Sequence, residues 1–250
     1  MKPLFSVITV TYNASQWLER TIRSVQEQSY EHIEYLVIDG GSTDGTVQII
    51  QNNSSIISYY VSEPDKGLYD AMNKGLLAAK GDYIWFLNAG DTFYSPETIT
   101  NIVSALNEQQ LPDIIYGETC LTNASGEITG MRRLKAPEKL TWKSFRKGML
   151  VCHQSFVVKR EMAPVYDLTY RLASDVDWCI RCLQSATIIY NTRTTLSCFL
   201  EAGLSTTQRK ESLKERYHIM CQHYGKASTQ MIHLWFAVRF YAAKWLTGRV

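Results

Sequence analysis

The first ninety residues alternate between strand-like and helical segments, and this alternation limits the possible folds more than any other feature of the chain. The strand-like runs, rich in β-branched and aromatic residues, span 5–10, 35–38, 56–61 and 83–87. The segments with apolar residues at helical spacing span 17–25, 46–50 and 68–79. Strands joined through helices predict a parallel sheet with right-handed crossovers. We therefore expect an α/β fold.

A polar cluster follows each predicted strand. The clusters are Thr11-Tyr12-Asn13, residues 39–44, residues 63–67 and Asn88-Ala89-Gly90-Asp91. Any one of them would be an ordinary turn, since Asp, Asn, Gly and Ser favour turns. Ligands of parallel sheets, however, bind at the carboxyl ends of the strands, where all four clusters meet. The sequence therefore predicts a binding pocket at this edge.

The pocket lacks the two common phosphate-binding motifs. No G-x-G-x-x-G follows the first strand, and G-x-x-x-x-G-K-[ST] is absent from the sequence. Asp39 at the end of the second strand could instead accept an N–H of a nucleobase. Asp91 at the end of the fourth strand, expected to be an exposed carboxylate, could hold Mg²⁺ or Mn²⁺ against phosphates. This pair of carboxylates indicates a nucleoside diphosphate bound with a metal.

The rest of the chain is mixed rather than strictly alternating. We expect helices at 96–107 and 176–183, strands at 113–116 and 156–158, and a hairpin near 123–126. A helical tail over 209–246 is expected to break near Gly225. The 250 residues contain no repeat and no low-complexity linker, so we expect one fused unit.

Composition excludes several classes of protein. A net charge of +2 argues against a dedicated nucleic-acid binder, and no apolar run is long enough to predict a membrane span. The N-terminus has no features of a secretory signal, so we expect a cytoplasmic protein with its six cysteines reduced. Cys179 and Cys182 form a C-x-x-C within an apolar helical pattern, which favours buried thiols over a metal site.

Three motifs together carry a resemblance to a known family. They read FSVITVTYN, VIDGGSTDGT and SEPDKGLYDAMNKGLLAAKGDYIWFLNAGD, and the similarity continues more loosely through HQSFVVKR and LASDVDW to about residue 205. The chain resembles a family-2 inverting glycosyltransferase of the GT-A fold, of the bacterial surface-polysaccharide type. The resemblance implies a transferase domain over 1–205, with a nucleotide-sugar half (1–92) and an acceptor half (93–205). Residues 206–250 would then form a separate helical tail.

The resemblance also implies which residues bind the donor. They are Thr9, Thr11, Tyr12, Asn13, Asp39, Ser42, Asp65, Lys66, Asn73, Asn88, Ala89 and Gly90. By similarity Asp39 accepts the base N–H, and Lys66 pairs with the diphosphate. Asp91 matches the family's direct metal ligand for Mn²⁺ or Mg²⁺. Asn88 and Gly90 stand where the family's D-x-D motif has carboxylates, which should weaken metal binding without the nucleotide.

An inverting transfer also needs a general base for the acceptor hydroxyl. Asp175, at the start of a predicted helix, matches the family's base position, and Asp177 is the rival two residues later. The alternative for this pair is that one carboxylate caps the helix while the other faces solvent. His153 and Gln154 resemble the acceptor-side segment.

The processive relatives carry Q-x-x-R-W and several membrane helices, and this sequence has neither. The expected activity is therefore the transfer of one sugar, from a UDP-sugar by preference, to a glycan acceptor in surface polysaccharide synthesis. A nucleotidyltransferase is a weaker alternative, because no glycine-rich basic loop follows the first strand. A non-catalytic sugar-nucleotide or glycan-binding module also stays open, because two motif carboxylates are missing.

The last fifty residues are basic and amphipathic. They hold eight Lys or Arg against three Glu. On a helical projection one face carries Met231, Leu234, Trp235, Val238, Tyr241, Ala242, Trp245 and Leu246. Such a face predicts peripheral contact with the cytoplasmic side of the inner membrane, where a polyprenyl-linked acceptor would lie. The same face could instead pack on the catalytic domain or on a second subunit.

Overall fold

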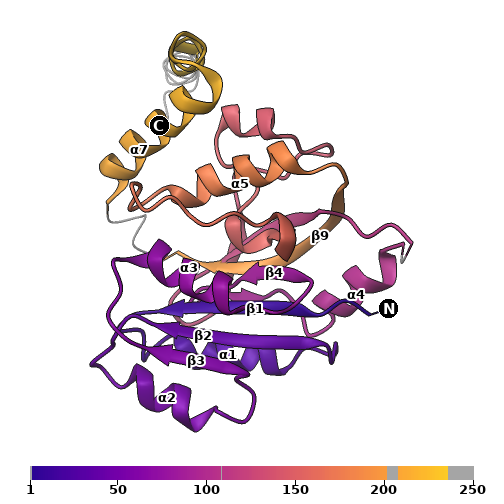
Figure 1. Cartoon of the computed structure of the whole chain (residues 1–250), viewed down its shortest axis with the longest axis vertical. Coiled ribbons are helices and arrows are strands. Elements are labelled where there is room, and N and C mark those ends of the chain that lie inside the picture. Colours follow the sequence, from indigo (N-terminus) through magenta and orange to yellow (C-terminus); the bar gives the residue numbers. More distant parts are fainter. Residues whose placement is uncertain (1, 108, 202–207, 236–250) are drawn as a thin grey trace.

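A computed structural model describes residues 2–107, 109–201 and 208–235 of the chain. Within these residues nine strands form one mixed sheet, in the order β3-β2-β1-β4-β8-β6-β9-β5 with β7 paired to β6 (Figure 1). The strands are β1 (Phe5–Thr11), β2 (Ile33–Asp39), β3 (Tyr59–Ser62), β4 (Tyr83–Phe86), β5 (Thr92–Phe93), β6 (Ile114–Thr122), β7 (Ile128–Met131), β8 (Phe156–Lys159) and β9 (Ile189–Leu200). β1 to β4 are mutually parallel, as expected, and β8 begins the antiparallel part.

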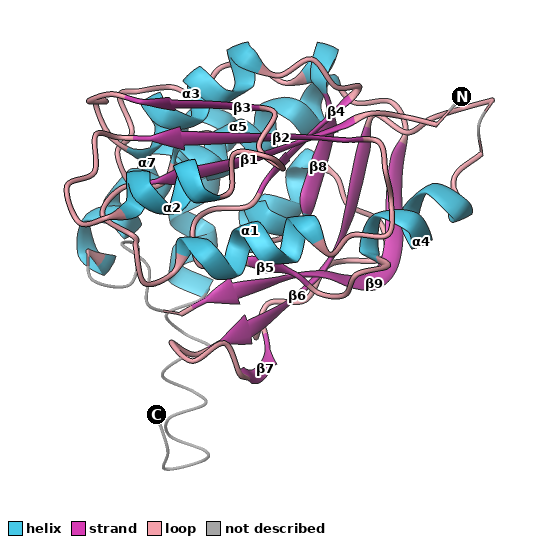
Figure 2. Ribbon diagram, turned by 90° about the horizontal axis from the view of Figure 1, so that it is seen from below, coloured by secondary structure: helices cyan, strands magenta, loops and turns pink. Residues whose placement is uncertain are grey.

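Helices cover both faces of the sheet. They are α1 (Leu18–Gln26), α2 (Thr46–Asn52), α3 (Leu68–Ala78), α4 (Thr98–Ala105), α5 (Ser174–Ser185) and α7 (Arg209–Tyr224). Short 3₁₀ turns occur at η1 (Trp142–Lys147), η2 (His153–Ser155) and η3 (Arg160–Met162). Figures 1 and 2 show α1, α2 and α4 on one face and α3 and α5 on the other. The predicted third strand begins later than expected, at Tyr59, because residues 53–56 form turns after α2.

The two-sided cover explains the apolar strands. Side chains alternate across a sheet, so Ile8 and Val10 of β1 pack toward α3 and α5, whereas Phe5 and Val7 pack toward α1. All seven residues of β1 are buried. A strand buried on both faces reads as a continuous apolar run, which is what the sequence shows.

Two cysteines depart from the expectation that all six are reduced. The register between β6 and β9 places Cys120 opposite Cys198, and the two form a disulfide with a Cα–Cα distance of 4.6 Å. The expectation was wrong for this pair, because residues 78 apart in sequence become neighbours only through strand pairing. Cys179 and Cys182 are free and buried in α5, as predicted.

The C-terminal helix packs on the α5 side of the domain. Tyr224 at the end of α7 stacks on Trp142 at 5.4 Å, and His223 contacts Asp177 of α5. Gly225 breaks the helix with a φ of +82°, as predicted, and helical structure resumes over 226–235. In the described part of the chain no helix is long and apolar enough to cross a membrane. The predicted tail residues Val238, Tyr241, Ala242, Trp245 and Leu246 lie outside the described residues.

Candidate functional site

The carboxyl ends of β1, β2 and β4 meet at one edge of the sheet. Thr11 pairs with Asp39 across β1 and β2, and Ala89 follows β4 with its N–H donated to Val10. Two buried polar atoms here, Oγ1 of Thr11 and Oδ1 of Asn88, have no hydrogen-bond partner among the described residues. A buried polar group without a partner is costly, so a pair on neighbouring strands marks a place where a ligand can complete the bonding.

Asp39 is fully buried and its carboxylate is already occupied. Oδ2 accepts the N–H groups of Gly41 and Ser42 and the hydroxyl of Ser62, at 3.1, 2.9 and 2.6 Å. Oδ1 accepts the Ser42 hydroxyl. In this arrangement the carboxylate organises the turn after β2 and leaves no exposed oxygen for a nucleobase.

Asp65 lies over Gly40, the residue directly after Asp39 in the chain. A Cβ at Gly40 would collide with Oδ2 of Asp65 and touch the ring of Tyr12, so these three residues lie together. Oδ1 of Asp65 accepts the N–H of Gly67 at 2.8 Å, whereas its Oδ2 has no hydrogen bond within the described ranges. Tyr12 is 65% exposed. The result is an open carboxylate oxygen beside an exposed aromatic ring.

Other predicted donor residues build the loops around this point. Asn13, in the left-handed conformation, donates its N–H to Ser42 at 2.7 Å and accepts that of Thr43 at 2.9 Å. Thr9 is buried and bonds Leu87, which places it in the sheet interior beneath the edge. The sequence placed Thr9 at the donor site, but the structure shows its hydroxyl in the core.

Lys66 and Asn73 lie on either side of the α3 N-terminus. Lys66 is exposed and available to an anion, with its backbone N–H donated to Asp70. Asn73 makes two bonds to the backbone of Tyr166, at 2.7 and 3.0 Å. Asn73 thus ties α3 to the segment before α5.

Side chains of α1 hold the turn over Asn88-Ala89-Gly90-Asp91. Gly90, with a φ of +101°, donates its N–H to Thr21 at 2.8 Å, and its carbonyl accepts from Arg20. Asp91 is only 3% exposed, and its two oxygens accept the N–H of Leu200 at 2.9 Å and the amide of Gln154 at 2.7 Å. The expectation of an exposed strand-end carboxylate was therefore wrong, because β9 and η2 cover it.

Burial changes the electrostatics of this carboxylate. Desolvation raises the pKa of Asp91 to about 7, while the bonds from Leu200 and Gln154 and the charge of Arg20 oppose that rise. A Mn²⁺ or Mg²⁺ ligand needs an ionised oxygen that is open to the cation. Asp91 has both oxygens engaged by N–H donors and a guanidinium beside it, and Asn88 and Gly90 add no carboxylate.

No group of three or more His, Cys, Asp or Glu side chains that could hold a metal occurs within residues 2–107, 109–201 and 208–235. The residues around Asp91 therefore do not fit the divalent cation that the family resemblance implies.

Asp175 lies at the start of α5, across from the start of α3. Its Oδ1 accepts the Tyr69 hydroxyl at 3.1 Å and the N–H of Val176 at 3.0 Å. No bond to Oδ2 occurs in the described part of the chain, and the side chain is partly exposed. Tyr69 follows Asp65 by four residues, so α3 brings Asp175 close to the donor edge. A half-open carboxylate at this place can accept a proton.

Asp177 points elsewhere. It is buried and pairs with Arg181 at 2.6 Å and with His223 of α7 at 2.7 Å. Although burial opposes the shift, these two bonds lower the pKa of Asp177. The carboxylate therefore links α5 to α7 instead of sharing the face of Asp175.

His153 and Gln154 are both buried, and each bonds protein groups. Nε2 of His153 lies 2.5 Å from the Tyr166 hydroxyl, and burial lowers the pKa of His153 to about 4. Gln154 bonds Asp91 as described above. The structure thus places these two residues beneath the site, where they connect Asp91 to the aromatic residues around Asp175.

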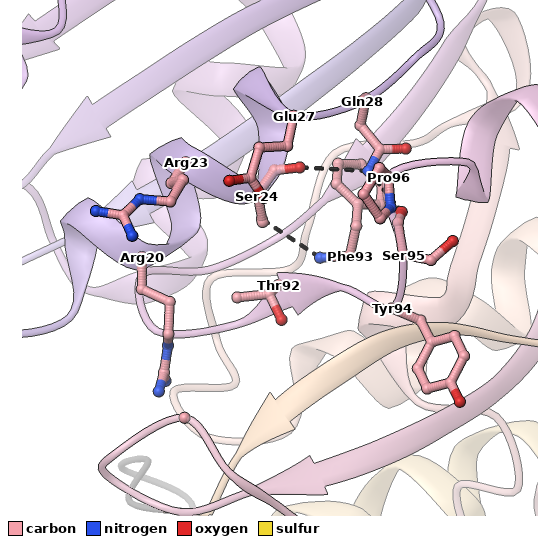
Figure 3. A pocket seen from close by; sticks show the side chains of 11 residues that line it. Arg20, Arg23, Ser24, Glu27, Gln28, Thr92, Phe93, Tyr94, Ser95 and Pro96 are labelled. Atoms are coloured by element: carbon pink, nitrogen blue, oxygen red, sulfur yellow. Dashed lines mark hydrogen bonds between the residues drawn. The ribbon is translucent and has the colours of Figure 1, made fainter.

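A hollow in the protein lies away from this edge. It measures about 270 Å³, lies between α1 and β5, and is lined by Arg20, Arg23, Ser24, Glu27, Gln28, Thr92, Phe93, Tyr94, Ser95, Pro96 and Gly126 (Figure 3). Arg20 connects it to the turn after β4, because its guanidinium donates to the carbonyl of Gly90. We place the candidate site at the sheet edge, where the unpartnered polar atoms and the open carboxylates lie.

Two residues at the site were missed from the sequence. Tyr69 sits in a helical pattern and reads as core, and Arg20 reads as a solvent-facing helix residue. Nothing in their local sequence indicates that Tyr69 reaches Asp175 or that Arg20 reaches Gly90, since the partners are 106 and 70 residues away. The resemblance to the family was the only available signal, because Tyr69 lies within its third motif.

Comparison with known proteins shows which family the chain resembles. The model of the family described as glycosyl transferase family 2 matches residues 6–163. An uncharacterised glycosyltransferase of Mycobacterium tuberculosis is 35% identical over 184 residues, which cover 72% of this chain and 68% of the relative. A PGL/p-HBAD biosynthesis glycosyltransferase of Mycobacterium bovis is 28% identical over 193 residues, with 75% and 72% covered.

Solved structures share the fold at low identity. S. aureus TarS 1-349 in complex with UDP-GlcNAc has a TM-score of 0.69 at 16% identity, covering 99% of this chain and 76% of that one. The mannosyltransferase PcManGT of Pyrobaculum calidifontis, in complex with GDP-Man and Mn²⁺, has a TM-score of 0.68 at 17% identity, covering 100% and 77%. The expected GT-A architecture is confirmed by these neighbours.

Proposed function

Because the chain belongs to glycosyltransferase family 2, we propose that it is an inverting, non-processive transferase that moves one sugar from a nucleoside diphosphate sugar to a glycan acceptor. The observation that carries this proposal is the position of Asp175. Its Oδ1 is held by two donors, and α3 brings it close to the loop that presents Asp65, which lies beside Tyr12. A fixed base beside a donor site is what a single displacement requires.

The donor would bind at the edge formed by β1, β2 and β4. A base stacked on Tyr12 would find Oδ2 of Asp65 as an acceptor for its ring N–H, since the Asp39 carboxylate is occupied. The unpartnered groups of Thr11 and Asn88 lie at the neighbouring strand ends for the ribose. A UDP-sugar is our preferred donor, and the TarS complex with UDP-GlcNAc supports that choice.

The chemistry is one displacement at the anomeric carbon. The acceptor oxygen attacks as the bond to the diphosphate breaks, and Asp175 takes the proton from the acceptor hydroxyl. The nucleoside diphosphate leaves with the bonding electrons, and the new glycosidic bond has the opposite anomeric configuration. Lys66 is exposed near the α3 N-terminus and would balance charge on the leaving diphosphate.

The proposal also covers the acceptor and the location of the protein in the cell. Helical residues 226–235 expose Met231 and Leu234, which are 66% and 67% exposed, in a tail with excess positive charge. Such a surface suits the interface of an anionic membrane. We propose peripheral binding to the cytoplasmic face of the inner membrane, where a polyprenyl-linked saccharide of a surface polysaccharide would be the acceptor. The relation to glycosyltransferases named for PGL/p-HBAD and teichuronic acid biosynthesis supports that class.

The proposal is tested by a screen of UDP-, GDP- and dTDP-sugars. Thermal shift reports binding, and release of the nucleoside diphosphate reports turnover. We expect at least one UDP-sugar both to raise the melting temperature and to be consumed. Binding without any turnover, in the presence of Mn²⁺ and a lipid-linked saccharide extract, would point to a non-catalytic module. Absence of binding by all three classes would contradict the proposal.

A further inference from the structure

Tyr69 connects the start of α3 to the carboxylate at the start of α5. Its hydroxyl donates to Oδ1 of Asp175 at 3.1 Å, the oxygen that also accepts the N–H of Val176. The two donors approach from different elements, so they fix one oxygen of the carboxylate in position. Oδ2 is left without a hydrogen bond in the described part of the chain.

The Tyr69 ring is held by an aromatic stack. It lies parallel to Tyr166 with ring centres 5.5 Å apart, and Tyr166 lies parallel to Trp178 at 5.0 Å. The Tyr166 hydroxyl is engaged by His153, so it does not compete for Asp175. Tyr69 is 4% exposed, and a buried phenol fixed in this way loses little entropy when it donates.

Burial and the charge of Asp175 raise the pKa of Tyr69 well above its usual value, so the phenol stays protonated and remains a donor at neutral pH. The titratable and charged groups near this pair are Cys179 of α5 itself and, from other parts of the chain, His153 of η2, Tyr166, Cys152 and Arg216 of α7. His153 has its pKa lowered to about 4 by burial and is uncharged at neutral pH.

We propose that Tyr69 is the positioning residue of the reaction, which holds Oδ1 of Asp175 so that Oδ2 faces the acceptor hydroxyl. This inference rests on the proposed function, since it assumes that Asp175 is the base. Tyr69 itself touches neither donor nor acceptor and transfers no proton.

The test compares Tyr69→Phe with Tyr166→Phe in the full-length protein. Both changes delete one buried hydroxyl from the same stack, but only the first removes a bond to Asp175. We expect Tyr69→Phe to lower kcat about tenfold with the donor KM unchanged, because the base loses its orientation. We expect Tyr166→Phe to keep kcat within about twofold of the wild type, because that change leaves both hydrogen bonds to Asp175 in place. Near-ultraviolet circular dichroism confirms that both variants keep the fold.

The control separates positioning from structure. Tyr69→Phe should lower kcat while Tyr166→Phe leaves it close to the wild-type value, with the donor KM unchanged in both. An equal loss of kcat in both variants would assign the effect to the aromatic stack, and an unchanged kcat in Tyr69→Phe would leave Tyr69 with a packing role; either result overturns the inference.

A double variant tests whether Tyr69 acts through Asp175. If Tyr69 acts through Asp175, Tyr69→Phe should cost nothing further in an Asp175→Asn background. Additive losses would overturn the inference. Should Asp175→Asn alone keep the wild-type kcat, the base assignment in the proposed function fails, whatever Tyr69 does.

Discussion

Two neighbouring aspartates at the sheet edge have opposite environments. Asp39 is engaged by the turn that follows it and by Ser62 of β3, whereas Oδ2 of Asp65 has no hydrogen bond within the described residues and lies over Gly40 beside Tyr12. The family resemblance assigns the base contact to Asp39. The geometry instead supports Asp65 as the acceptor for the base N–H, with Asp39 shaping the loop that positions it.

The role of Asp65 is tested by moving its carboxylate to position 40. Asp65→Gly should weaken UDP binding by about tenfold or more, because the base N–H loses a charged acceptor. In the double variant Gly40→Asp with Asp65→Gly, the new side chain enters the vacated space, and Gly40 does not have a positive φ that would oppose it. We expect calorimetry to show partial recovery of UDP affinity. Unchanged affinity in Asp65→Gly would contradict the assignment.

The pair Asp175 and Asp177 was left unresolved by the sequence, because both lie in the first turn of one helix. The structure separates them through partners that are distant in the chain: Tyr69 for the first and His223 for the second. Asp175→Asn should lower kcat by roughly 10²–10⁴-fold with stability unchanged. Asp177→Asn should mainly lower stability, by about 2–4 kcal/mol, since it breaks a buried ion pair. Single-turnover kinetics measure the first effect and urea unfolding measures the second. A loss of turnover in Asp177→Asn together with a loss of stability in Asp175→Asn would exchange the two roles.

The turn after β4 is tied to β9 and η2 through Asp91. Asp91→Ala should lower the free energy of unfolding by about 2–4 kcal/mol, because the N–H of Leu200 and the amide of Gln154 lose their acceptor. Asp65→Ala is the control, since a half-buried carboxylate with a free oxygen should cost less than about 1 kcal/mol. Equal losses in urea unfolding would show that Asp91 is not the tie.

The same carboxylate predicts a pH dependence. Burial raises the pKa of Asp91 from 3.8 to about 7, so the folded protein holds a proton that the unfolded chain releases between these values. The contribution of Asp91 to stability therefore falls as pH rises from about 4 to 7. The loss caused by Asp91→Ala should be larger at pH 5 than at pH 8. A loss that grows with pH would contradict the buried geometry.

The order of the first four strands and of the helices between them followed from the sequence, because each of these strand runs is apolar and each turn carries Gly, Asp or Asn. The strands β5 and β9 were not expected. The clusters after β1, β2 and β4 meet at one edge of the sheet, as expected, and the binding site at that edge stays a prediction. Contacts between distant elements did not follow, since nothing local to Asp91 indicates that Leu200 and Gln154 cover it. The Cys120–Cys198 disulfide was not predicted for the same reason, because only the β6–β9 register brings the two residues together.

Within the described residues, the sheet and its covering helices are extended by α7 and the helical residues 226–235, and α7 packs on α5. Thr229 is fully buried, whereas Met231 and Leu234 are exposed, so the packed and exposed parts of residues 226–235 are only a few positions apart. The exposed part is the surface we propose to meet the membrane.

Liposome co-sedimentation tests that surface. The full-length protein should pellet with anionic vesicles and be released by salt, and Met231→Ser with Leu234→Ser should reduce the pelleted fraction severalfold. A chain ending at residue 230 keeps Thr229 and should stay in the supernatant as a folded protein. If the truncated protein instead unfolds or changes its oligomeric state and still binds lipid, the removed segment stabilises the protein and is not the membrane-binding surface.

The central claim is that the molecule transfers a sugar with inversion at the anomeric carbon. Proton NMR of the reaction with a UDP-sugar, recorded in real time before the product mutarotates, reads the configuration of the first sugar product released to water or bound to acceptor. We expect release of UDP together with a product of configuration opposite to the donor, and loss of both signals in Asp175→Asn. A first product that retains the donor configuration, or full turnover by Asp175→Asn, would contradict it.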